Sequence, residues 1–155
     1  MSGSLEHSPA EVIRNLLVAK GAGTMPTASG SWPIYHSLEP DLPDKVITVY
    51  NETGIKQGRT QIDGEVQEKH GIQIRVRSSN ERNGYKKARQ LADLVDKQVR
   101  QDLITLANVE TAGNSTYRVV CISRVGDVIS LGTELSATKR HLFTLNCLVP
   151  MRQVS

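Results

Sequence analysis

A seven-residue run of alternating apolar and polar residues constrains this fold most strongly. Residues 71–77 read Gly-Ile-Gln-Ile-Arg-Val-Arg. In a strand, every second side chain faces the same way, so the apolar and polar members lie on opposite faces. The apolar set is Ile72, Ile74 and Val76, and the polar set is Gln73, Arg75 and Arg77. The run predicts a strand with its apolar face against a core.

A second pattern begins at Tyr85, where the period of apolar residues changes from two to that of a helix. The apolar positions that form this stripe are Tyr85, Ala88, Leu91, Ala92, Val95 and Val99. The positions that turn to solvent are Lys86, Lys87, Arg89, Asp93 and Lys97. The spacing predicts an amphipathic helix, with Ser79 or Asn83 as its capping residue.

Near the N-terminus, the residues Ser8-Pro9-Ala10-Glu11 predict the start of another helix. Serine caps such a start, proline suits the first helical position, and glutamate three residues after the serine completes a capping box. An apolar stripe follows, formed by Val12, Ile13, Leu16 and Leu17, and Lys20-Gly21 ends the helix. Residues 1–7 are expected to form a flexible N-terminal tail.

The remaining segments favour β-structure. We expect a short edge strand at residues 32–36, a buried strand at 46–50, and strands at 116–125, 128–131 and 140–149. Residues 51–64 contain three glycines among polar residues and are expected to form a long connection, while residues 125–128 have hairpin character. Residues 102–109 fit either a helical extension or a strand. Residues 151–155 are expected to be a C-terminal tail.

This order of elements predicts an α+β protein, with two helices packed on one face of a mainly antiparallel sheet. The 155-residue length suits a single domain, placed at residues 8–150. Its hydrophobic fraction is 38% with only six aromatic residues, so the core is modest. We expect partner subunits to cover part of the apolar surface, in a ring-forming protein.

Composition argues against several classes of protein. The net charge of +3 is small for a dedicated DNA-binding protein. No apolar run approaches the ~20 residues of a membrane helix, and residues 1–7 lack the features of a signal peptide. Cys121 and Cys147 lie outside zinc-ligand spacing, in strand-like runs, and are expected to be buried free thiols in a reducing compartment.

No catalytic pattern is present. The histidines His7, His36, His70 and His141 form no local metal pair, and each is expected to be solvated or hydrogen-bonded. His141 is a possible base for either cysteine, but nothing marks either thiol as activated. Glycine-rich phosphate motifs and calcium-loop spacing are absent. We therefore expect no enzyme activity, no cofactor and no metal.

Basic residues offer the only candidate functional surface. Arg59, Arg75, Arg77 and Lys86 are candidates for an interface or a lumen, and an ordinary solvated face is the competing interpretation. A small nucleic-acid-binding module that uses Arg75, Arg77 and Lys86 is a further alternative. Aromatic residues do not alternate with these cations, which disfavours single-strand binding by stacking.

The middle third of the chain resembles a known family. It has a glycine-bearing loop with Arg59, then Asp63-Gly64, then the strand 71–77 with Ser78, then Tyr85 and Ala88 opening an amphipathic helix. This order is similar to that of small phage minor capsid and tail-completion proteins, and more narrowly to the tail terminators of long-tailed, non-contractile phages. The run Phe143-Thr144-Leu145-Asn146-Cys147-Leu148-Val149 also suits that family.

The resemblance implies a structural virion protein, assembled in the host cytoplasm, at the head-proximal end of the tail. It implies a ring, usually a hexamer, that caps the tail tube, stops its polymerisation and offers a surface for head attachment. The implied partners are other copies of the chain, the tail tube protein and the head–tail connector protein. DNA would pass through the lumen without specific binding, and no membrane is involved. A head-completion or connector protein is the alternative within this class.

Overall fold

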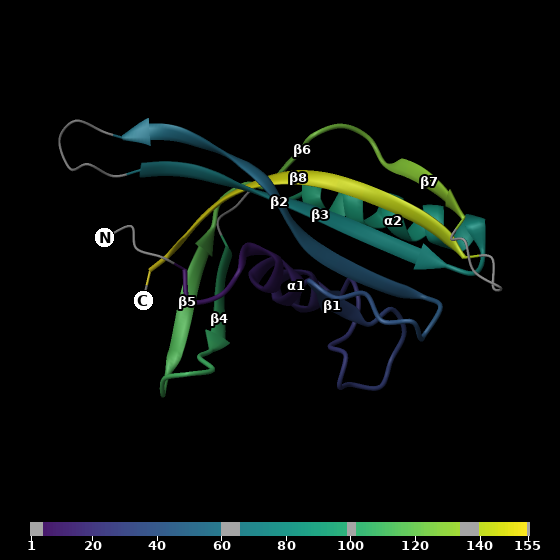
Figure 1. Cartoon of the computed structure of the whole chain (residues 1–155), viewed down its shortest axis with the longest axis horizontal. Coiled ribbons are helices and arrows are strands. Elements are labelled where there is room, and N and C mark those ends of the chain that lie inside the picture. Colours follow the sequence, from purple (N-terminus) through teal and green to yellow (C-terminus); the bar gives the residue numbers. More distant parts are fainter. Residues whose placement is uncertain (1–4, 60–65, 99–101, 134–139, 155) are drawn as a thin grey trace.

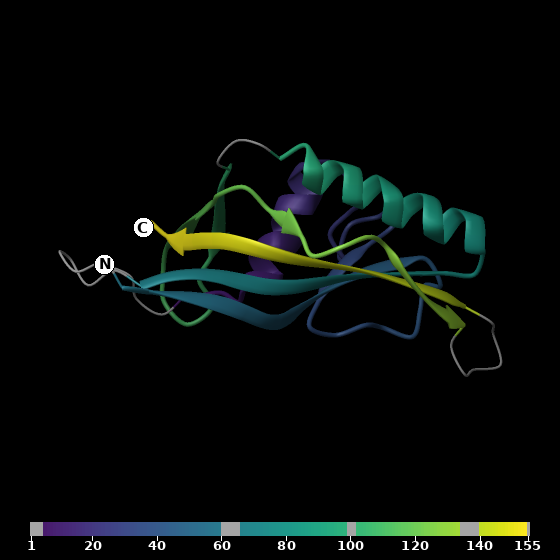
Figure 2. The ribbon, with the colours of Figure 1, turned by 90° about the horizontal axis from the view of Figure 1, so that it is seen from above.

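The computed structural model describes residues 5–59, 66–98, 102–133 and 140–154. Two helices lie over a long, twisted, mainly antiparallel sheet (Figures 1 and 2). The helices are α1 (Pro9–Ala19) and α2 (Glu81–Asp96). The strands are β1 (Ile34–His36), β2 (Val46–Arg59), β3 (Val66–Ser78), β4 (Asp102–Ala107), β5 (Asn114–Val119), β6 (Ser123–Arg124), β7 (Ile129–Thr133) and β8 (His141–Gln153). The predicted α+β class is confirmed.

Helix α1 begins and ends where the sequence predicts. The Ser8 side chain accepts a hydrogen bond from the backbone amide of Glu11, which satisfies one of the free donors at the helix start. Lys20 is the C-cap, and Gly21 follows with a φ of +80°, a conformation that glycine adopts without strain. The apolar stripe of α1 is buried. It packs mainly on β2 and β1.

Helix α2 covers the other half of the same face of the sheet (Figure 2). Its N-cap is Asn80, whose side chain accepts from the amide of Asn83, so neither predicted cap residue is correct. The helix lies very close to β8 at Gly84, where a Cβ atom would stand 2.8 Å from the Phe143 ring. The absence of a side chain at Gly84 therefore sets the distance between helix and sheet.

The sheet order is β1-β2-β3-β8-β5-β4, and β6 and β7 also pair with β8. Directly paired residues share a face, so the register Ile74–Leu145 places the predicted apolar side of β3 under the helices. Arg75 and Arg77 lie on the opposite face, called the back face below. The predicted alternation of this strand is confirmed.

The prediction of a long connection at residues 51–64 is wrong for its first nine residues, which belong to a strand. Strand β2 continues to Arg59 and pairs with β3 back to Val66, which forms a two-stranded arm that projects beyond the sheet (Figure 1). The register shifts between Glu52 and Ile55 at the base of this arm. At that point a Cβ on Gly71 would stand 2.3 Å from the carbonyl oxygen of Thr53, so glycine permits the close backbone contact.

The structure decides one open alternative and corrects two further predictions. Residues 102–107 are a strand, β4, which resolves the open alternative. The hairpin expected at residues 125–128 is wrong, because β6 and β7 do not pair with each other and each runs antiparallel to β8. Cys121 is exposed and lies outside the strands, whereas Cys147 is buried in β8 as expected.

Both expected tails are partly built into the fold. His7 is buried, and its Nδ1 and Nε2 atoms lie 2.8 Å from the Tyr117 hydroxyl and 2.9 Å from the carbonyl oxygen of Ala107. Strand β8 extends to Gln153, and Met151 is buried. Hydrogen bonds between distant residues override what the local sequence indicates at each end. None of the described helices is long and apolar enough to cross a membrane.

Candidate assembly surfaces

The two arginines of β3 make ion pairs or hydrogen bonds with other parts of the chain. Arg77 is buried, with 2% of its surface exposed, and its Nη2 atom donates to the carbonyl oxygens of Asp41 (3.0 Å) and Pro43 (2.7 Å). Glu39 lies 3.7 Å from both Arg77 and Arg75 and offsets part of their charge. The back face at this point is therefore covered by the segment between β1 and β2, and Arg77 serves to hold that segment.

Arg140 holds the same segment from the start of β8. Its guanidinium donates to the carbonyl oxygen of Asp41 and to the Asp41 carboxylate at 3.2 Å. Asp44 lies 3.6 Å away and adds a second negative charge. Two buried arginines from neighbouring strands thus fix residues 38–44, which we call the anchored loop.

The anchored loop presents apolar side chains to solvent. Leu38 and Leu42 are each 71% exposed, although their neighbours in the chain are held by arginines. A loop that is fixed before contact loses little conformational entropy when a partner covers it. The loop thus has the properties of a preformed contact surface. Sequence reasoning missed it, although leucines set between prolines and acidic residues were a usable signal.

The remaining predicted basic residues lie elsewhere. Lys86 is exposed on α2, and Arg59 is the last residue of β2, on the projecting arm. Arg75 is partly exposed on the back face. The structure therefore does not gather Arg59, Arg75, Arg77 and Lys86 into one basic surface, and their part in an interface or lumen stays a prediction.

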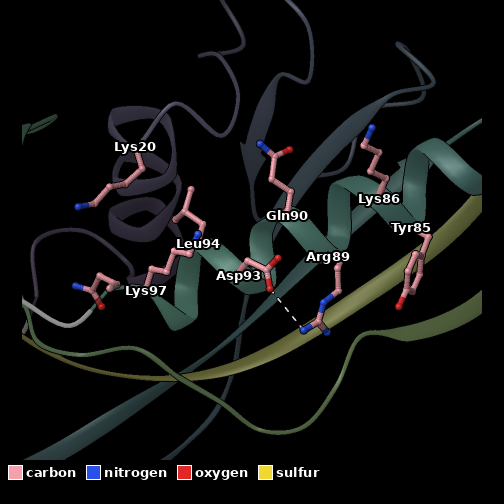
Figure 3. Close-up of a pocket in the computed structure, with 9 residues that line it drawn as sticks. Lys20, Tyr85, Lys86, Arg89, Gln90, Asp93, Leu94 and Lys97 are labelled. Carbon is pink, nitrogen blue, oxygen red and sulfur yellow. Dashed lines mark ion pairs between the residues drawn. The ribbon is translucent and has the colours of Figure 1, made fainter.

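An open groove of about 690 Å³ runs along the outer side of α2 (Figure 3). Its lining residues come from the C-cap of α1, from α2 and from the chain after α2: Lys20, Tyr85, Lys86, Arg89, Gln90, Asp93, Leu94, Lys97 and Gln98. Arg89 is 3.5 Å from Asp93 and 2.9 Å from Asp127, so its charge is already balanced. Lys20 pairs with Asp102 in the same way.

The groove is lined by three lysines, polar side chains and one aromatic ring, that of Tyr85. Beside it, Lys87 is buried against the ring of Trp32, 5.6 Å from the ring centre, so its predicted solvent-facing position is wrong, and this burial lowers the pKa of its amine. The contact is a cation–π interaction, in which the face of the Trp32 ring attracts the charged amine of Lys87.

Cys147 and His141 do not form a nucleophile–base pair. Burial raises the pKa of the Cys147 thiol to about 12, far from the range of an activated nucleophile. His141 lies on the same strand six residues away, a separation of about 20 Å. Cys121 has one hydrogen bond from its sulfur, to the carbonyl oxygen of Ile122. Among the described residues, no three His, Cys, Asp or Glu side chains are grouped as metal ligands.

A family model described as bacteriophage tail terminator protein matches residues 16–126, which is more than two thirds of the chain. The matched region runs from the end of α1 through β1–β6 and includes the anchored loop, the arm and α2. A search of curated proteins gives no match.

Proposed function

The chain belongs to the bacteriophage tail terminator family, and on that premise we propose that it caps the tail tube as a ring. The family makes the chain a structural component of a phage tail and of the virion. The ring, a hexamer in this proposal, sits on the head-proximal end of the finished tube. There it ends tube polymerisation and presents the surface to which the filled head attaches.

The observation that carries this proposal is the family match, because it spans most of the described elements. The exposed leucines of the anchored loop support it, since large apolar side chains held rigidly on a surface are typical of contact sites. The raised pKa of Cys147 argues only against this thiol as a catalytic nucleophile.

Termination follows from unlike faces of the ring. One face would pair with the last ring of tube subunits, and the other would lack the complementary surface for a further tube ring. The head–tail connector protein would then bind that second face, and assembly would take place in the host cytoplasm.

DNA has to pass through the lumen of such a ring without being held. A dense lining of free cations would attract the phosphates strongly. Here Glu39 lies 3.7 Å from both Arg75 and Arg77 and offsets part of their positive charge, and the net charge of the chain is only +3. This pairing supports passage of DNA and argues against a nucleic-acid-binding module that uses the two arginines.

The direct test measures tube length. Tail tube protein from the same phage is allowed to polymerise with and without this chain, and tube lengths are measured by electron microscopy. We expect shorter tubes with a ring at one end, and unchanged elongation would refute the proposal. Co-purification with tubes that lack heads supports a terminator, whereas co-purification with isolated heads indicates a head-completion or connector protein.

A further inference from the structure

In the described part of the chain, the sheet has edges at β1, at β4 and along one side of β8, where the short strands β6 and β7 lie. Strand β1 is flanked on its outer side by residues 24–33, through the hydrogen bond from the Ile34 amide to Thr24 and a bridge between Thr24 and Pro33. Strand β4 is held at both ends of its range, by His7 at the carbonyl oxygen of Ala107 and by Lys20 at the Asp102 carboxylate. These contacts occupy part of the β1 edge and the two ends of β4, and they limit unwanted strand pairing there.

Strand β7 is a longer edge than the two-residue β6, which also carries Arg124. Within the described ranges, its only strand partner is β8, and every one of its five residues is exposed. Ile129 and Leu131 are about half exposed, and residues 129–133 contain no charge or proline to discourage pairing. A bulge interrupts the register between Ser130 and Gly132. The bulge shortens the regular part of this edge, but an uncharged edge with two exposed aliphatic side chains is still a template for another strand.

The arm formed by β2 and β3 is the matching feature. Beyond Ile55 on β2 and Lys69 on β3, these strands pair only with each other in the described part of the chain. Residues 55–59 and 66–68 therefore have free outer edges. An isolated two-stranded ribbon is marginally stable in water, so a partner strand would stabilise the arm. The five residues 55–59 equal β7 in length.

The positions of the two features determine the kind of contact. The arm lies at one end of the long axis of the molecule and β7 at the other (Figures 1 and 2). The arm of a copy therefore lies far from its own β7. A contact between two different surfaces of identical copies is heterologous, and it closes into a ring when the rotation between copies permits.

We propose that the arm of one copy pairs with the open edge of β7 on the next copy, and that this strand addition is the joint of the ring. The inference rests on the proposed function, because it describes how that ring is held together. Backbone hydrogen bonds supply the pairing, and the exposed apolar side chains of β7 are covered in the joint. A second copy is the occupant because it carries the projecting ribbon that β7 lacks.

Two variants test the joint, and each disrupts one of its two pairing surfaces. The first, Ile129→Lys with Leu131→Lys, places charges on β7. The second replaces residues 55–69 by Asn-Gly, which shortens the arm to a tight turn between Gly54 and His70. The matched control is Leu103→Lys, because Leu103 is 61% exposed on the edge strand β4. Particle mass is measured by light scattering and native mass spectrometry, with and without tail tubes.

We expect each variant alone to be a monomer and the Leu103→Lys control to assemble as the wild-type chain does. Mixing the two variants is the decisive measurement. The charged variant keeps a working arm and the shortened variant keeps a working β7, so one joint forms and the mixture gives 1:1 heterodimers that do not grow. Misfolded variants would give no heterodimer, so this result also reports on folding.

Assembly that survives both changes, or that fails in the Leu103→Lys control, overturns the inference while the ring itself stands. A mixture that gives no heterodimer from two folded variants, as judged by circular dichroism, overturns it too. A wild-type chain that never assembles, even on tubes, refutes the ring and the inference together. The tube-length assay then decides separately whether the chain still ends tube growth.

Discussion

Arg140 binds both the backbone carbonyl and the carboxylate of Asp41, a residue 99 positions earlier in the chain. The same carbonyl oxygen accepts a hydrogen bond from Arg77 on the neighbouring strand. Strands β3 and β8 are thus joined to the anchored loop through one residue. The loop depends on buried cations for its conformation, and its leucines remain free for a partner.

Replacing Arg77 by methionine should destabilise the protein strongly. The change leaves Glu39 without one of its cations, and it leaves the carbonyl oxygens of Asp41 and Pro43 without this donor in a buried position. Breaking a buried charge pair from one side costs about 3–5 kcal/mol. We expect a loss of that order in the free energy of unfolding, measured by denaturant titration.

Arg75→Met is the matched control, because Arg75 lies on the same strand and face and contacts the same Glu39 at 3.7 Å. Its side chain is 28% exposed, and partly exposed ion pairs contribute about 0–1 kcal/mol. Equal losses from the two variants would contradict the anchoring role of Arg77. Arg77→Lys should behave like Arg77→Met, since an ammonium group does not reproduce the geometry of the guanidinium.

Gly84→Ala should also destabilise, although alanine is the better helix former. Alanine gains about 1 kcal/mol of helix propensity, but its Cβ would stand 2.8 Å from the Phe143 ring. Overpacking a core contact costs about 1–3 kcal/mol, so the net change is a loss. A double variant, Gly84→Ala with Phe143→Leu, should lose less than the sum of the two single changes. Additive losses in thermal or denaturant unfolding would show that the two residues are not coupled.

The elements that sequence predicted well are those whose pattern is local. Helix α1 shows its cap and its end within fourteen residues, and the strand 71–77 alternates without interruption. Prediction and structure agree at these elements because each pattern of apolar and polar residues lies entirely within one helix or strand. The family resemblance was also carried by this middle region, which lies inside the matched range.

What sequence reasoning missed depends on contacts between distant residues. Residues 51–59 are mostly polar and contain two glycines, yet they form a strand because β3 supplies their partners. His7 is fixed by Tyr117, 110 residues away, and the anchored loop by Arg77 and Arg140. A local pattern cannot reveal a hydrogen-bond partner elsewhere in the chain. The hairpin predicted at residues 125–128 is wrong for the same reason. Strands β6 and β7 pair with β8 and not with each other.

The two cysteines should differ sharply in reactivity. Cys121 is exposed, whereas Cys147 is buried and its thiol has a pKa of about 12. Only the thiolate reacts with disulfide reagents, so burial and ionisation both protect Cys147. A colorimetric thiol reagent at pH 8 should modify one thiol per native chain and two in denaturant. Fast modification of both thiols in the native protein would contradict the burial of Cys147.

The raised pKa of Cys147 also predicts how stability depends on alkaline pH. A thiol that ionises near 9.0 when unfolded and near 12 when folded keeps its proton better in the folded state. The folded chain therefore binds more protons above pH 9, and the stability that this group contributes is complete below pH 9 and declines from there towards pH 12. The slope is about 1.4 kcal/mol per pH unit inside that window.

Comparison with Cys147→Ala isolates this contribution from the tyrosines and lysines that titrate in the same range. At pH 8 the variant should be less stable by about 1 kcal/mol, because a buried sulfur is removed. Its disadvantage should shrink as pH rises above 9 and reverse by about pH 10, since alanine does not ionise. Unfolding free energies from denaturant titrations at several pH values measure the difference. A constant gap between the two proteins from pH 8 to pH 10.5 would mean that the Cys147 thiol ionises equally well in the folded and unfolded chain.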